Sequence, residues 1–296
     1  MTYLDHIRAC NRLENISYLP FIVRDTTLGW VRRDRADILK AYGDIVSVDD
    51  HRVAFAPSIP VAGYDAAIAA VVDRLAGEGH IAPKRNELYD VAPSVRTPAL
   101  FLMERAAVSF FGIAACGVHL NGYVRKNDNI FLWTGKRASD RKIEPGKLDN
   151  VVAGGQPTGL SLRDNLLKEA AEEAAMPRTL AIRARPAGMV RYCLDTGTGL
   201  RRDTLFCYDL DLSEGFVPHN TDGETESFHL LPVEEICRLM RETNDFKFNV
   251  PLVIIDFLIR HGHLSADNEP DYAALCAGLH GPEHPHPENA VECRHA

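Results

Sequence analysis

The chain has 296 residues, of which 46% are hydrophobic and 25% are charged. At roughly 100 to 200 residues per domain, this length predicts two globular domains, each with its own apolar core. The 33 Lys and Arg residues are outnumbered by 41 Asp and Glu residues, which gives a formal charge of −8. This balance argues against binding to a nucleic acid polymer, which needs a basic surface, and leaves small anionic ligands open.

The N-terminal residues carry charges from Asp5 onward and contain no apolar run typical of a secretory signal peptide. The longest apolar stretch, residues 99–118, is interrupted by Glu104 and Arg105, so no segment has the roughly 18 apolar residues of a membrane span. The seven cysteines include no CxxC pair, which argues against a disulfide framework and a zinc site. We therefore expect a cytoplasmic protein that does not contact a membrane.

Short helices and strands alternate over residues 1–110. Thr2 and Asp5 have the spacing of a capping box at a helix start. The pattern then predicts a strand at 20–24, a helix from Asp34, a hairpin of 44–48 and 51–56, and a helix at 64–76. We expect a small α+β domain here.

From residue 111 the chain becomes rich in strands. Two strands are predicted at 111–125 and 130–137, and a hairpin at 187–197 and 200–212 follows further on. An apolar helix within residues 246–264 ends near Gly262. Beyond residue 264 the composition shifts to Pro, Glu, Gly and His, which predicts a loosely ordered tail over 265–296.

Residues 154–176 combine a glycine-rich loop with an acidic helix. Glu169, Glu172 and Glu173 stand at i, i+3 and i+4, so their side chains share one helix face. Such a face is either solvated or neutralised by a cation, and carboxylate oxygens are the ligands that Mg²⁺ prefers. Ser161 and Asp164 have the spacing of a helix cap, and Pro177 ends the helix.

This segment resembles the signature of the Nudix hydrolases: Gly, five residues, Glu, seven residues, then Arg-Glu-apolar-any-Glu-Glu-any-Gly-apolar. In this register Gly154 is the first glycine, Glu169 follows the Arg position, Glu172 and Glu173 form the Glu pair, and Met176 is the last apolar residue. Three positions depart from the pattern: Leu160 replaces the early Glu, Lys168 replaces Arg, and Ala175 replaces the final Gly. The three carboxylates are retained.

The resemblance implies an α+β fold, in which a Nudix α/β/α sandwich with a mixed β-sheet is preceded by a small α+β domain. The implied boundaries are 1–110 for the N-terminal domain, 111–264 for the Nudix domain and 265–296 for the tail. RNELY, GWVR, ERAA and GVHLNGYV further resemble a Nudix subgroup associated with thiamin pyrophosphokinase and acting on thiamin diphosphate analogues. Thiamin diphosphate or its oxidised analogues are therefore the expected substrates.

The implied chemistry is hydrolysis of a diphosphate by water attacking phosphorus, with Mg²⁺ or Mn²⁺ as the cofactor. Glu169, Glu172 and Glu173 would hold the metal, and Lys168 would orient these carboxylates. Glu224 and Glu226 alternate on a predicted strand and should share one of its faces. One of the three or Glu224 would take the proton of the water; an exposed strand edge explains the two glutamates almost as well. The remaining substrate contacts would be Arg137, Gly154 and Gly155.

Two other functions are compatible with the sequence. One is a general hydrolase of nucleoside-diphosphate-linked (NDP-X) compounds, and the other is a noncatalytic Nudix-like binding module. In each case the expected partner is a small-molecule diphosphate, and a homodimer is left open.

Overall fold

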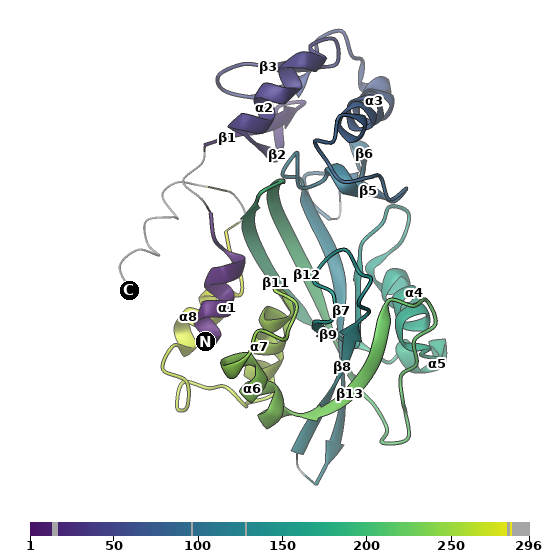
Figure 1. Cartoon of the computed structure of the whole chain (residues 1–296), viewed down its shortest axis with the longest axis vertical. Coiled ribbons are helices and arrows are strands. Elements are labelled where there is room, and N and C mark those ends of the chain that lie inside the picture. The colour runs from purple at the N-terminus through teal and green to yellow at the C-terminus, as the bar shows by residue number, and fades with distance from the viewer. Residues whose placement is uncertain (14–16, 96, 128, 283–284, 286–296) are drawn as a thin grey trace.

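The structure, a computed structural model, describes residues 1–13, 17–95, 97–127, 129–282 and 285. A smaller part that starts with the strand at Tyr18 and covers most of the first hundred residues lies at one end of the molecule, and a larger part with a long twisted sheet lies beneath it (Figure 1). The prediction of an α+β fold is confirmed. Within the described residues, no helix has the length and apolarity needed to cross a membrane.

The smaller part is built on a four-stranded sheet with the order β2-β1-β4-β3. Side chains of β1 alternate between buried and half-buried, as expected of a strand with one face on a core. Phe21 points into this core, where its ring centroid lies 5.4 to 6.1 Å from those of Phe55, Phe101 and Phe111. The elements are β1 (Tyr18–Val23), β2 (Thr26–Arg32), α2 (Arg33–Leu39), η1 (Lys40–Tyr42), β3 (Val46–Val48), β4 (Val53–Phe55), η2 (Val61–Gly63) and α3 (Tyr64–Gly77).

A two-stranded antiparallel sheet follows α3 and connects the two parts. It consists of β5 (Leu88–Val91) and β6 (Phe101–Glu104), and the short 3₁₀ helix η3 (Arg105–Ala107) continues from β6. Glu104 is buried because its carboxylate accepts hydrogen bonds from the backbone N–H groups of Arg85 (2.8 Å) and Ala106 (3.3 Å). These bonds hold the segment before β5 against the start of η3.

The larger part contains a mixed sheet with the order β11-β12-β7-β8-β13. Only the β12–β7 pair on this path is parallel, whereas β10 and β9 pair antiparallel with β7 and β8. The predicted strand pair and hairpin are confirmed. The strands are β7 (Ala114–Lys126), β8 (Asn129–Arg137), β9 (Leu148–Asn150), β10 (Val152–Gly155), β11 (Arg185–Thr196), β12 (Gly199–Asp211) and β13 (Thr225–Pro232).

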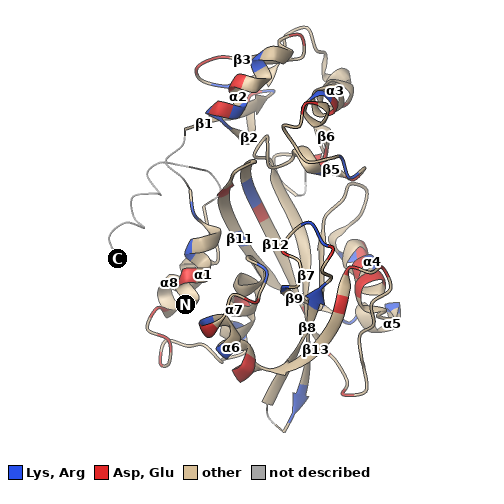
Figure 2. Ribbon diagram, in the orientation of Figure 1, with Lys and Arg blue, Asp and Glu red and all other residues tan. Residues whose placement is uncertain are grey.

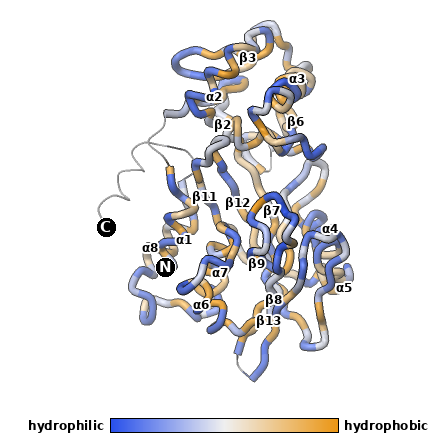
Figure 3. Tube along the Cα trace, in the orientation of Figure 1, coloured by the Kyte–Doolittle hydropathy of each residue, from blue (hydrophilic) through white to orange (hydrophobic). Residues whose placement is uncertain are grey.

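Helices cover both faces of this sheet, as predicted for an α/β/α sandwich. On one face, Val118 and Leu120 pack in a cluster with Leu166 of the signature helix; on the other, Val190 and Leu205 pack with helix α7. Apolar residues recur along the strands and α7 (Figure 3). The helices of this part are α4 (Leu162–Ala174), α5 (Arg178–Ala181), α6 (Val233–Glu242) and α7 (Val250–Arg260).

The two ends of the chain meet on the α7 side of the sandwich. Helix α1 (Tyr3–Cys10) has the expected capping box of Thr2 and Asp5, and Ile7 packs in the same cluster as α7. Helix α8 (Tyr272–Gly278) packs there too, through Leu275. The prediction of a loosely ordered tail is therefore wrong for this helix, because α1 and α7 provide an apolar surface that local composition does not reveal. Residues 283–284 and 286–296 lie outside the described residues.

Candidate active site

A cavity of about 740 Å³ opens where the two parts of the chain meet. Its wall is formed by β5 and η3 of the smaller part and by β7, β10 and α4 of the larger part. Acidic residues on α4 and basic residues in the loop before β9 belong to this region (Figure 2). All eight residues proposed from the sequence line the cavity: Arg137, Gly154, Gly155, Lys168, Glu169, Glu172, Glu173 and Glu224.

Helix α4 is fixed at both ends. At its start, the Ser161 hydroxyl accepts the backbone N–H of Asp164 at 3.1 Å, while it donates to the Asp164 carboxylate at 2.6 Å. At its end, Ala175 adopts the left-handed conformation with φ 50° and ψ 31°, and the Met176 N–H donates to Ala170 O at 2.9 Å. This is the conformation that glycine favours, which explains the glycine at this position of the signature.

Gly154 and Gly155 let two side chains approach the β10 backbone closely. A Cβ atom at Gly154 would lie 2.4 Å from Cδ of Glu169, and one at Gly155 would lie 1.9 Å from Oη of Tyr89. Any larger residue at these positions would displace the carboxylate or the tyrosine. The two glycines therefore set the distance between the loop, the acidic helix and the smaller part.

Glu169, Glu172 and Glu173, called the acidic wall below, differ in their surroundings. The side chain of Glu169 is 15% exposed and that of Glu172 is 49% exposed. Burial raises the pKa of Glu169, and burial together with Glu169 raises the pKa of Glu173 well above its ordinary value. One oxygen of Glu173 accepts the Ala153 N–H at 2.8 Å. Both partly buried carboxylates would gain stability from a nearby cation.

Lys168 provides the cation nearest to this wall. Its ammonium lies 2.6 Å from Glu172 and 3.2 Å from Glu169. As they stand, no three His, Cys, Asp or Glu side chains of the described residues are grouped closely enough to hold a metal ion. The donor set nevertheless fits a hard cation, because it consists of carboxylate oxygens whose charge is poorly compensated. Lys168 is 45% exposed, so its side chain can turn to solvent.

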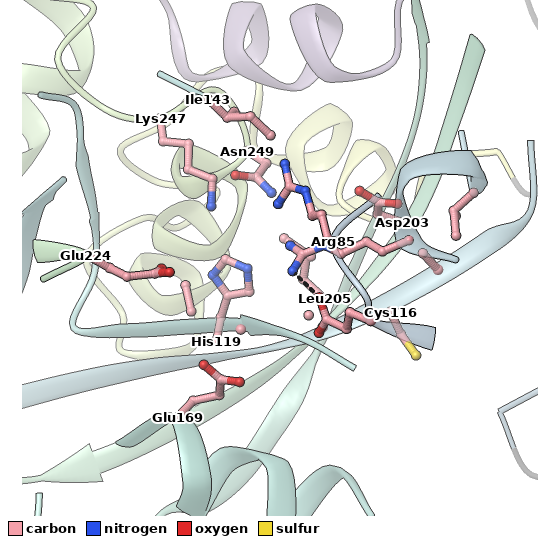
Figure 4. A pocket seen from close by; sticks show the side chains of 18 of the residues that line it. Arg85, Cys116, His119, Ile143, Glu169, Asp203, Leu205, Glu224, Lys247 and Asn249 are labelled. Carbon is pink, nitrogen blue, oxygen red and sulfur yellow. Dashed lines mark hydrogen bonds and ion pairs between the residues drawn. The ribbon is translucent and has the colours of Figure 1, made fainter. Parts of the chain in front are cut away.

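Glu224 lines the cavity, as Figure 4 shows, and forms an ion pair with Arg141. The expectation that Glu224 and Glu226 share one face of a strand is wrong. Glu224 precedes β13, and the register shifts between Thr225 and Ser227, so the alternation is broken at Glu226. Glu226 pairs instead with Lys136 at 3.2 Å.

Arg137, the predicted phosphate contact, is already engaged by protein groups. Its guanidinium donates to Asp149 at 3.0 Å and to the backbone O of Ile143 at 2.9 and 3.2 Å. Lys247 reaches the same Asp149 oxygen at 3.0 Å. Burial alone would raise the pKa of Asp149, but Lys247 and Arg137 hold it below its ordinary value. Arg137 therefore shapes the loop that carries Arg141.

The sequence did not single out the cations that the smaller part brings to the cavity. Arg85 lies before β5, and Arg105, at the start of η3, pairs with Glu87 at 2.6 Å. Burial and the neighbouring Arg105 and Arg141 lower the pKa of Arg85. Arg85, Arg105 and Arg141 are called the basic wall below. The segments RNELY and ERAA contain the first two, but only the fold brings them to the cavity that α4 lines.

His119 of β7 also lines the cavity and was not predicted. Burial, together with the charge of Lys247, lowers its pKa to about 4, so the imidazole is neutral at pH 7. Its Nδ1 lies 2.8 Å from Oδ1 of Asn150. In Figure 4 the side chains of Glu169, Glu224 and Lys247 point toward the space that the ring also faces.

Comparisons with known proteins agree with this architecture. A family model described as a domain of unknown function (DUF4743) matches residues 2–115. Nudix hydrolase 24, chloroplastic, from Arabidopsis thaliana is 40% identical over 278 residues, which cover 92% of this chain and 76% of the relative. Nudix hydrolase 20, chloroplastic, from the same plant is 40% identical over 283 residues, covering 90% and 74%.

Among solved structures, the NUDIX domain of Shewanella oneidensis NrtR complexed with ADP ribose resembles part of the chain. The identity is 13% and the TM-score is 0.41, over 51% of this chain and 90% of that one. A TM-score of this size does not by itself establish a shared fold.

The names of the two plant relatives contradict the expected cytoplasmic location, because both are chloroplastic. That expectation was based on the lack of a secretory signal, which does not distinguish the cytoplasm from an organelle. The family itself follows from the high identity over most of both relatives, together with the acidic helix and glycine loop in one cavity. The chain belongs to the Nudix hydrolase family.

Proposed function

We propose that this chain hydrolyses the diphosphate of a small molecule by attack of water on phosphorus. The observation that carries the proposal is the lining of the cavity, in which the acidic wall of α4 and the basic wall face one common space. A volume of about 740 Å³ suits a small molecule rather than a polymer. A diphosphate with a divalent cation would neutralise both walls at once.

Glu169, Glu172 and Glu173 would hold Mg²⁺ or Mn²⁺, which supplies Lewis-acid chemistry when it is bound. Lys168 would then leave its ion pairs with Glu169 and Glu172. Gly154 and Gly155 would keep the β10 backbone close to the phosphate groups. Glu224, held by Arg141, is one candidate for taking the proton of the attacking water.

The basic wall would bind the phosphate oxygens. Arg85 and Arg105 reach the cavity from the smaller part, and Arg141 reaches it from the loop before β9. Arginine guanidinium groups bind phosphates through paired hydrogen bonds, which suits a terminal phosphate. In this proposal Arg137 acts indirectly, because Asp149 and Ile143 already occupy its donors.

The proposed substrate is thiamin diphosphate or an oxidised analogue, cleaved to the monophosphate and phosphate. The resemblance of RNELY, GWVR, ERAA and GVHLNGYV to the thiamin-associated subgroup supports this choice. A further support lies at another part of the cavity wall, where the Tyr192 hydroxyl donates to Asp203 at 2.5 Å and Asn249 Nδ2 lies 3.4 Å from Tyr192 Oη. The remaining acceptor oxygens of Asp203 and Asn249 suit an aminopyrimidine, which donates N–H groups.

The test is an activity panel with the full chain and Mg²⁺. Thiamin diphosphate, oxothiamin diphosphate, oxythiamin diphosphate, ADP-ribose and deoxynucleoside triphosphates would be incubated separately, and phosphate and mononucleotide release measured. We expect thiamin-type diphosphates to have the highest kcat/KM, and chelation by EDTA to abolish turnover. Reaction in ¹⁸O-labelled water should place the label on phosphorus.

The outcomes separate the alternatives. Turnover of nucleotides alone would reject the thiamin substrate and favour the general NDP-X hydrolase. If every compound binds but none is cleaved, the protein is a noncatalytic module and the proposal fails. Glu214→Gln is a suitable control, because Glu214 pairs with Lys126 outside the cavity and should leave every rate unchanged. Light scattering on the same sample would decide whether the chain forms a homodimer.

A further inference from the structure

A chain of buried polar side chains leads from the α7 side of the sheet to the cavity and ends at His119. His119, Asn121 and Asn150 are only 3%, 1% and 7% exposed. Burying such groups costs free energy unless every one of them is hydrogen-bonded, so their arrangement calls for a functional explanation.

The donor and acceptor of each hydrogen bond in this chain follow from the charge of Asp209, which lies at the end away from His119. Asp209 is ionised, because the hydrogen bonds of His261 and Arg260 overcome its burial and lower its pKa. It therefore accepts from Asn121 Nδ2 (3.1 Å), which leaves Asn121 Oδ1 to accept from Asn150 Nδ2 (3.0 Å). Asn150 Oδ1 must then accept from His119 Nδ1 at 2.8 Å.

This order fixes the tautomer of His119. With the proton on Nδ1, the lone pair is on Nε2, which has no hydrogen-bond partner among the residues that the structure describes. His119 pairs across the sheet with Ala153, whose N–H binds Glu173. Cross-strand neighbours have Cα atoms roughly 4.5 to 5.5 Å apart, so His119 lies beside the strand whose backbone binds Glu173, and both side chains line the same cavity.

A neutral acceptor at this place cannot serve as a phosphate ligand. Phosphate oxygens at pH 7 are mainly acceptors, and two lone pairs facing each other repel. Nε2 can therefore face a proton donor or a cation when the cavity is filled, and a proton donor suits it better because Mg²⁺ prefers oxygen ligands. The donor that hydrolysis requires in this cavity is the attacking water.

We propose that His119 is a catalytic residue whose Nε2 accepts a hydrogen bond, and then the proton, from the water that attacks phosphorus. The inference rests on the proposed hydrolysis. The water O–H bond breaks as its proton goes to Nε2, the water oxygen bonds to phosphorus, and the bond from phosphorus to the leaving phosphate breaks. Asn150 and Asn121 are positioning residues, which stabilise the charged ring through Nδ1–H.

Charged groups from several elements surround the imidazole. Lys247 disfavours the protonated ring, whereas Asp149 favours it. The charged groups that act on the ring are thus Lys247, before α7, and Asp149 of β9. Arg137 of β8, Glu169 and Glu173 of α4, and Glu224 before β13 line the same cavity as His119.

The first test needs no substrate. In a ¹⁵N-labelled full chain at pH 7, side-chain NMR distinguishes the Nδ1–H tautomer, the Nε2–H tautomer and the imidazolium form. The His119 signal would be assigned by its absence in His119→Gln. We expect the Nδ1–H tautomer in the wild type. An Nε2–H tautomer or an imidazolium form at pH 7 would overturn the proposal.

The second test is kinetic, with Mg²⁺ and the best substrate of the panel. We expect His119→Gln to lower kcat about 100-fold or more, with KM changed less than about threefold. His51→Gln is the matched control, since His51 is exposed in the smaller part and does not line the cavity. A kcat for His119→Gln within threefold of the wild type would also overturn the proposal.

Asn150→Asp leaves His119 in place and tests the positioning role of Asn150 separately. A carboxylate facing Nδ1–H favours the imidazolium form, so the acidic limb of the pH profile of kcat should move up by about 1 to 3 pH units. A merely structural role would lower activity without moving that limb. If the wild type cleaves no diphosphate, the proposed function fails and the catalytic role fails with it, whereas the NMR result still stands for the tautomer.

Discussion

The acidic and basic walls of the cavity are built in opposite ways. Glu169, Glu172 and Glu173 come from one helix within five positions, whereas the arginines of the basic wall come from three separate segments. Each wall contains one group whose own charge is disfavoured: burial raises the pKa of Glu173, and burial and neighbouring arginines lower the pKa of Arg85. Arg105 differs, because Tyr89, Glu87 and Glu169 raise its pKa although burial would lower it. Glu173 and Arg85 are thus the groups that most need a counter-charge from a ligand.

This difference indicates how a ligand would bind. A metal ion alone would neutralise the acidic wall but would add positive charge to a cavity that already contains three arginines. A free phosphate alone would neutralise the arginines but would add negative charge near the carboxylates. A diphosphate together with a divalent cation relieves both walls, since their combined charge is small. The predictions below remove one wall at a time.

Glu173→Gln should have the largest effect. The amide oxygen can still accept the Ala153 N–H, so the fold is kept, but a ligand for the cation is lost. If this costs about 4 kcal/mol of transition-state stabilisation, kcat falls roughly 1,000-fold. Steady-state kinetics with Mg²⁺ would measure it.

The stability of Glu173→Gln should increase, although its kcat falls. Because the folded-state pKa of Glu173 is raised, the folded state binds its proton more tightly, and deprotonation at higher pH destabilises the wild type. Without metal, the variant should therefore have a higher melting temperature than the wild type at pH 8. This difference in melting temperature should vanish as the pH falls to the range in which glutamate ordinarily titrates. Glu172→Gln, at a residue 49% exposed, should show little stability change. A wild-type kcat in Glu173→Gln would remove this residue from the site.

The acidic wall was predictable because its geometry is local. Spacings of three and four residues put the carboxylates on one helix face, whatever the rest of the chain does. The cap at Ser161 and the strand pairs were predictable for the same reason. The sandwich itself followed from the resemblance of residues 154–176 to a known signature.

The basic wall and the His119 relay were not predictable, since they depend on packing between distant segments. Arg85 and Arg141 are 56 positions apart in the sequence, and Asn121 meets Asp209 only because β7 and β12 pair in parallel. The sequence led us to predict Arg137 as the phosphate contact instead, because the sequence does not reveal that Asp149 binds its guanidinium. Periodicity likewise failed at Glu226, where a register shift interrupts the strand.

Arg85→Ala tests the basic wall, with an intermediate effect. We expect KM to rise about tenfold, corresponding to the loss of about 1.4 kcal/mol of charge-assisted binding, and kcat to change less than threefold. The fold should be unharmed or slightly more stable, because one of three clustered like charges is removed. Arg178→Ala, at an exposed residue of α5, is the control. A fall in kcat with unchanged KM would contradict a binding role.

Ala175→Gly tests how far the acidic wall depends on the end of its helix, and its effect should be the smallest. Ala175 has φ 50°, where alanine is strained and glycine is not, so the variant should gain about 0.5 to 1 kcal/mol. The melting temperature should rise by roughly 2 to 4 °C per kcal/mol. Ala171→Gly, at an exposed position inside the same helix, should lose about 1 kcal/mol instead. If both variants keep the wild-type kcat, the acidic wall is positioned by Gly154 and the sheet rather than by the loop after α4; a lower melting temperature for Ala175→Gly would contradict the left-handed helix end.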